Sequence, residues 1–193
     1  MTKEYIKLKK RIEEIKENFS FFIEPYPKEI NNKNQDLIKS FILLCHTELE
    51  NYFENICIRI ISNSKATYDK NQKLFPSLLS LSLMSDRNFN DNEQDFTTPK
   101  SRLNKLYTNY FATINNNNGI KEKDLRKLLP IIGIEMTTID DTLLSQLNAF
   151  GTKRGQTAHT TKKQIRRFKE EVETVDNLIV ALEELDKIFE NTK

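Results

Sequence analysis

The sequence predicts an all-α fold, a helical bundle built on two long antiparallel helices with several shorter helices added. The chain of 193 residues contains only four glycines and five prolines, which favours long uninterrupted helices over a turn-rich β fold. Apolar residues recur at steps of three and four, as they do on one face of a helix, and no stretch is a convincing strand. The length predicts one domain, residues 1–193.

The first predicted helix spans residues 3–18, where Tyr5, Leu8, Ile12 and Ile15 share one face. Pro25 and Pro27 then interrupt the pattern. Residues 1–30 are therefore expected to form an N-terminal helix and a proline-containing linker, ahead of a core at residues 36–190.

The second predicted helix, at about residues 36–61, has the strongest signal. Its wide apolar stripe comprises Ile38, Ile42, Cys45, Leu49, Tyr52, Phe53, Ile56 and Ile60. The two cysteines of the chain, Cys45 and Cys57, both lie in this helix, which favours buried thiols over a disulfide. Two cysteines and the two distant histidines, His46 and His159, give no zinc-binding spacing.

The remaining segments predict shorter helices, followed by the second long one. The apolar stretch 72–84 is ambiguous between short helices and an irregular segment, and a polar loop follows it. Helices are expected at residues 99–114 with Pro99 in the first turn, at 121–129 up to Pro130, from Thr138 to about Arg154, and at 161–189. The apolar stripe from Ile165 to Phe189 suits the bundle core, with part of it available as a dimer seam.

The charge distribution is more informative than the net charge of +2, which is too small to indicate a nucleic-acid partner. Residues 151–169 contain seven Lys and Arg and no acidic residue, whereas residues 170–193 contain eight acidic residues and two Lys. The basic block could bind a polyanion such as RNA. The simpler interpretation is that it forms a helix face exposed to solvent.

Several classes of protein are not expected. No apolar run reaches the roughly 18 residues of a membrane-spanning helix, and the N-terminus is too charged for a signal peptide, so a cytoplasmic protein is expected. The sequence has no glycine-rich phosphate loop and no acidic metal cluster, so no cofactor and no metal are expected.

Arg154 and His159, in the stretch GTKRGQTAHT, are the candidate catalytic pair. An arginine fork suits phosphate oxygens, and a histidine can move a proton near neutral pH. On one ideal helix the two residues lie about 140° apart around the axis, so they converge only if the helix ends or bends, for which Gly155 is the natural place. The simpler interpretation is that both side chains compensate the negative end of a helix dipole.

The surroundings of this pair resemble the HEPN superfamily, whose signature is an arginine followed four to six residues later by a histidine. Ala158 before His159 fits the common form of that signature. The segment LLCHTELENYFENI, with Glu48, Glu50 and Tyr52, is similar to the branch associated with RiboL-PSP-type genes. The resemblance covers roughly residues 36–190 and implies a HEPN-like helical bundle.

The resemblance implies a metal-independent endoribonuclease, with Arg154 and His159 as its catalytic residues. A ribose 2′-hydroxyl would attack the adjacent phosphorus, leaving a 2′,3′-cyclic phosphate and a 5′-hydroxyl end. Members of the family usually form homodimers with a composite active site. Many serve as toxins or in antiphage defence, which implies an RNA substrate and an antitoxin or defence-system partner.

One departure from the family pattern is Gly155, because the position after the arginine is commonly polar. Gln156, Thr157 and Thr160 are candidates to supply the missing contact, and Glu48 is a candidate to orient Arg154 or His159. An equally good interpretation of Glu48 is a half-exposed surface residue. If the site is degraded, the protein is instead a non-catalytic HEPN-type module that binds RNA or protein.

The other candidates have simpler interpretations beside the functional ones. His46 lies at the boundary of the apolar stripe, and Tyr52 suits core packing better than stacking on a base. The expected RNA-binding residues are the cations around and after the motif: Lys153, Lys162, Lys163, Arg166, Arg167 and Lys169.

Overall fold

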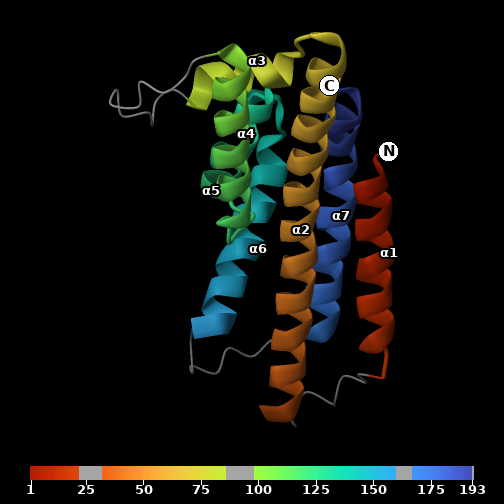
Figure 1. Ribbon diagram of the computed structural model, residues 1–193. Helices are drawn as coiled ribbons and strands as arrows, with labels where there is room; N and C mark the ends of the chain where they lie inside the picture. Colours follow the sequence, from red (N-terminus) through yellow and green to blue (C-terminus); the bar gives the residue numbers. More distant parts are fainter. Residues whose placement is uncertain (22–31, 86–97, 160–166, 193) are drawn as a thin grey trace.

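The computed structural model describes residues 1–21, 32–85, 98–159 and 167–192, and the side chains within them except those of residues 32, 33, 85, 158 and 159. The described residues form helices and connections without a strand, so the predicted all-α class is confirmed (Figure 1). The α-helices are α1 (Lys3–Asn18), α2 (Asn32–Asn71), α3 (Pro76–Ser85), α4 (Pro99–Asn115), α5 (Glu122–Leu128), α6 (Asp141–His159) and α7 (Phe168–Asn191).

Helix α1 has the predicted bounds. The Thr2 hydroxyl caps its N-terminus by accepting a hydrogen bond from the Tyr5 backbone at 3.1 Å. The four predicted apolar residues of this helix are all buried. Helix α1 runs antiparallel to α7, since Thr2 contacts Asp186 whereas Lys16, further along α1, contacts the earlier Asp176. The predicted proline-containing linker falls mostly on residues 22–31, outside the described residues.

The two long helices, α2 and α7, run parallel, so the prediction of an antiparallel pair is wrong. Phe41 packs on Phe168 at the start of α7, and Arg59, further along α2, donates to the carbonyl of Phe189 near the end of α7. The reason is the position of α6, which descends beside the ascending α2 in Figure 1. Because α7 reverses direction after α6, it takes the direction of α2.

The other helices differ from the predictions mainly in length. Helix α2 extends to Asn71, and the ambiguous apolar stretch forms α3. Pro99 lies in the first turn of α4, as predicted, after a cap at Thr98. Pro130 begins a short 3₁₀ helix, Pro130–Ile132, which Gly133 ends at a φ of 84°. The predicted loop at 85–96 and the predicted start of the last helix at 161 lie almost wholly outside the described residues.

The core predictions for α2 are confirmed. Cys45 and Cys57 are free and buried, and burial raises the pKa of each thiol to about 12. Tyr52 is also buried, and its hydroxyl donates to Asp186 at 2.9 Å. This contact assigns Tyr52 to the core and not to stacking on a base.

Candidate functional site

Arg154 lies on α6, half-buried, at the edge of a cleft of about 310 Å³. One wall of the cleft is the connection between α4 and α5 together with α5 itself, and the other is α6. Gly151 and Gly155 line the cleft on the α6 side, and His46 of α2 also lines it. None of the described side chains forms a hydrogen bond or ion pair with the Arg154 guanidinium, which leaves its fork available to a ligand.

His46 is a buried histidine that borders the same cleft. Its side chain is 2% exposed, its ring is stacked near Phe150 at 6.3 Å between centroids, and Nδ1 is 4.0 Å from Glu50 Oε2. Burial lowers the pKa of His46 to about 4, and the positive charge of Arg154 contributes to this shift. The ring is therefore neutral at pH 7, so one of its nitrogens can donate a hydrogen bond and the other can accept one.

The charge of Arg154 acts on Glu50 of α2, whereas the candidate Glu48 contacts α1. Glu48 Oε1 accepts from Arg11 Nε of α1 at 3.1 Å, because residues 48 and 50 lie about 200° apart around a helix. Burial and the charge of Glu54 raise the pKa of Glu50, while the charge of Arg154 lowers it. The Oε1 atom of Glu50 is buried and has no hydrogen-bond partner among the described residues.

Helix α6 passes Gly155 without ending and reaches His159. The helix end that would have brought Arg154 and His159 together within one chain is therefore absent from the backbone. The side chain of His159 lies outside the described residues, as does Thr160, so the pairing of His159 with Arg154 stays a prediction. A Cβ at Gly155 would meet nothing within 4 Å, so this position is open towards the cleft.

The predicted RNA-binding cations fall into three groups. Lys162, Lys163 and Arg166 lie outside the described residues. Lys153 Nζ contacts the buried Glu171 of α7 at 2.7 Å, which ties its charge to the bundle. Arg167 is exposed at 3.8 Å from Glu170, and Lys169 is exposed as well.

Of the auxiliary candidates beside the motif, the structure describes the side chains of Thr157 and Gln156. The Thr157 hydroxyl donates back to the Lys153 carbonyl at 2.8 Å, within its own helix. Gln156 is exposed. Their proposed roles remain predictions.

The cations that do line the cleft with Arg154 are Lys121, Lys123 and Lys127, which the sequence analysis did not select. They lie about 30 residues before the motif, beyond the reach of helical periodicity, and only the packing of α5 against α6 brings them together. A run of asparagines and Gly119 before the segment KEKDLRK was the signal available in the sequence.

A larger hollow of about 530 Å³ lies between α1 and α2, away from Arg154. Three of its charged side chains form ion pairs between the two helices, since Arg59 Nε lies 3.2 Å from Glu4 Oε2 and Glu48 pairs with Arg11. The smaller cleft at Arg154 is therefore the stronger candidate site. Within the described ranges no group of residues could hold a metal ion, and no helix is long and apolar enough to cross a membrane.

The model of the family described as RiboL-PSP-HEPN matches residues 6–191, which is nearly the whole chain and includes α1. No curated protein and no solved structure matches the chain.

Proposed function

The chain belongs to the RiboL-PSP-HEPN family, and from this premise we propose that it is a metal-independent endoribonuclease. Domains of this family suggest a nucleic-acid-related role, and many HEPN domains are ribonucleases. The observation that carries the proposal is Arg154, an arginine without a protein partner among the described side chains, beside a cleft lined by three lysines. A fixed guanidinium fork among other cations suits a phosphodiester.

In the proposed reaction the ribose 2′-hydroxyl loses its proton and attacks the neighbouring phosphorus. The bond from phosphorus to the 5′-oxygen breaks, that oxygen takes up a proton, and a 2′,3′-cyclic phosphate remains. Arg154 stabilises the negative charge that grows on the phosphoryl oxygens, and His159 transfers a proton.

The site is proposed to be completed in a homodimer. On one continuous helix Arg154 and His159 lie about 140° apart, so a second copy is a natural source of the other half of the pair. By the same family resemblance we propose that the protein acts in the cytoplasm as a toxin or antiphage effector.

The test is incubation of the purified protein with total cellular RNA in EDTA, beside Arg154→Ala and His159→Ala. Each substitution is expected to lower the cleavage rate by on the order of 100-fold or more. Arg126→Ala is the matched control, because Arg126 pairs with Glu122 on the surface of α5 and does not line the cleft. Wild-type fragments should end in cyclic phosphate.

Intact RNA after treatment with folded wild type would contradict the nuclease. Binding of RNA without cleavage would favour the non-catalytic module, for which the open Gly155 is the supporting observation.

A further inference from the structure

We propose that the cleft between α5 and α6 is a subsite for the RNA backbone, in which Lys121, Lys123 and Lys127 hold phosphates next to the one that Arg154 contacts. This inference rests on the proposed function and names the part of the protein that binds the substrate strand. Its first support is the balance of charge, because the described residues that line the cleft include four cationic side chains and one carboxylate, Asp124.

Lys121 lies directly against α6. A Cβ built on Gly151 would be 2.8 Å from Lys121 Cγ and 3.2 Å from its Cε, so the lysine stem crosses the helix where the glycine has no side chain. Gly151 precedes Arg154 by three residues, about one turn. The charges of Lys121 and Arg154 both lower the pKa of His46, which places the two cations near one ring.

The one carboxylate of the cleft is engaged within the protein. Asp124 is 9% exposed, its Oδ2 accepts from the Lys121 backbone at 3.3 Å, and its Oδ1 lies 3.7 Å from Lys127 Nζ. Glycine at 119 leaves room for this carboxylate, since a Cβ there would be 2.3 Å from Asp124 Oδ2. Asp124 therefore stabilises the start of α5. The positive charge of the cleft exceeds the single negative charge of this carboxylate.

The connection between α4 and α5 is held in place by its own hydrogen bonds. Asn117 Nδ2 donates to Glu54 Oε1 at 3.1 Å and to the Gly119 carbonyl at 3.0 Å, and Asn118 Nδ2 donates to the Asn116 carbonyl at 3.0 Å. These bonds keep the lysine-bearing wall in one position before any ligand arrives, which lowers the entropy cost of binding.

The lining points to phosphates and not to bases. Among the described residues that line the cleft there is no Phe, Tyr or Trp, and the ring of His46 is only 2% exposed, so these residues offer little aromatic surface for stacking. Lysine ammonium groups act on phosphates as point charges and carry little sequence information. We therefore expect affinity for single-stranded RNA of any sequence, with a strong dependence on salt.

The test is fluorescence anisotropy with a single-stranded 2′-O-methyl RNA oligonucleotide, which lacks the attacking hydroxyl and stays intact. The variant Lys121→Ala/Lys123→Ala/Lys127→Ala is expected to raise Kd by on the order of 10-fold or more and to reduce the slope of log K against log salt by about 2. The matched control is Lys9→Ala/Lys10→Ala/Lys70→Ala, which removes the same charge from α1 and the end of α2. Its slope should stay close to that of wild type.

A second variant distinguishes weaker RNA binding from a loss of folded protein. Lys123 is exposed, so Lys123→Glu is expected to keep the thermal stability of wild type and still weaken binding. Unchanged Kd and slope in the cleft variants, or an equal loss in the control, would overturn the subsite.

The two proposals can fail separately. Cleft-dependent binding without any cleavage in EDTA would support the subsite and contradict the nuclease. Cleavage that needs His159, together with wild-type binding by the triple cleft variant, would support the nuclease and overturn the subsite.

Discussion

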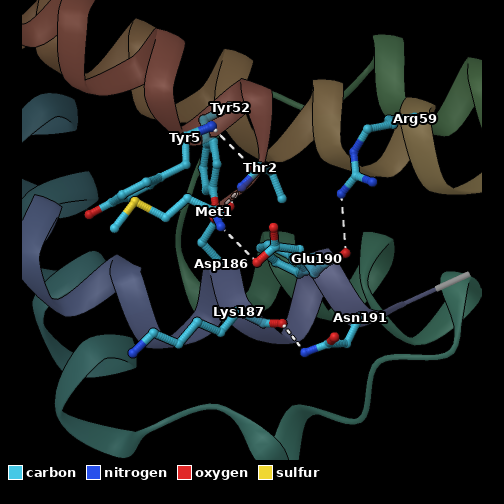
Figure 2. A network of polar contacts seen from close by, with 10 residues as sticks. Met1, Thr2, Tyr5, Tyr52, Arg59, Asp186, Lys187, Glu190 and Asn191 are labelled. Carbon is cyan, nitrogen blue, oxygen red and sulfur yellow. Dashed lines mark hydrogen bonds and ion pairs between the residues drawn. The ribbon is translucent and has the colours of Figure 1, made fainter.

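Two groups of buried polar residues in this bundle differ in how completely they are hydrogen-bonded. Figure 2 shows the first, around Asp186 of α7. The Asp186 carboxylate accepts from the Thr2 backbone at 2.7 Å, the Thr2 hydroxyl at 2.5 Å and the Tyr52 hydroxyl at 2.9 Å. Helices α1, α2 and α7 are tied together at this point.

The second group, at the Arg154 cleft, is incomplete. His46 and Glu50 are separated by 4.0 Å at their closest nitrogen and oxygen, and Glu50 Oε1 has no partner among the described residues. A buried polar group without a partner costs free energy, so evolution usually keeps one only where it serves a function. The difference indicates that the Asp186 group holds the fold together, and the incomplete group beside Arg154 fits the ligand site proposed above.

The largest expected effect on stability is at Asp186. The variant Asp186→Ala leaves three buried donors unpaired and should lower the free energy of unfolding by about 3–4 kcal/mol. Urea denaturation measures this loss. The matched control is Glu184→Ala on the same helix, whose exposed ion pair with Lys187 should contribute less than about 0.5 kcal/mol. If both variants lost a similar free energy of unfolding, the Asp186 group would not be a special source of stability.

An effect of intermediate size is expected from His46, as a dependence of the free energy of unfolding on pH. The pKa of His46 is about 4 in the folded protein and near 6.5 when unfolded, so the unfolded chain binds the proton more strongly. Stability that is present above pH 6.5 is therefore lost as the pH falls towards 4. Between pH 7 and about pH 4.5 this group alone should cost about 2 kcal/mol.

The measurement for His46 is urea denaturation at both pH values, for wild type and His46→Phe. Phenylalanine keeps a ring against Phe150 and cannot take up a proton. The variant should lose less stability than wild type on acidification, by roughly that amount. Parallel losses would mean that His46 is not held neutral by burial, Arg154 and Lys121.

The smallest effect is expected at the two glycines of α6. At Gly155 a Cβ meets nothing, so Gly155→Ala should raise the free energy of unfolding by about 0.5–1 kcal/mol. At Gly151 the new Cβ would displace Lys121, so Gly151→Ala should gain less. Thermal denaturation compares the two. Adding Lys121→Ala to Gly151→Ala should recover the gain, and its failure to do so would argue against the close approach of Lys121 to α6.

Much of the fold was predictable because its elements follow local patterns. The spacing of Tyr5, Leu8, Ile12 and Ile15 was sufficient for α1, and Pro99 was sufficient for the start of α4. The direction of α7 relative to α2 was not predictable, because periodicity identifies an apolar face and contains no information on the neighbour it meets. For the same reason the sequence could not separate Glu48 from Glu50 as the carboxylate nearer Arg154.

The sequence by itself determined the all-α class, most helix positions, the buried state of both cysteines and the resemblance to the HEPN superfamily, since all of these depend on residues close together in the chain. Only the tertiary structure decided which groups surround Arg154. His46 from α2 and Lys121 from the start of α5 reach the same cleft because α6 packs between those elements. Hydrophobic burial drives that packing and is non-directional, so the charged groups it brings together can be known only once the helices are in place.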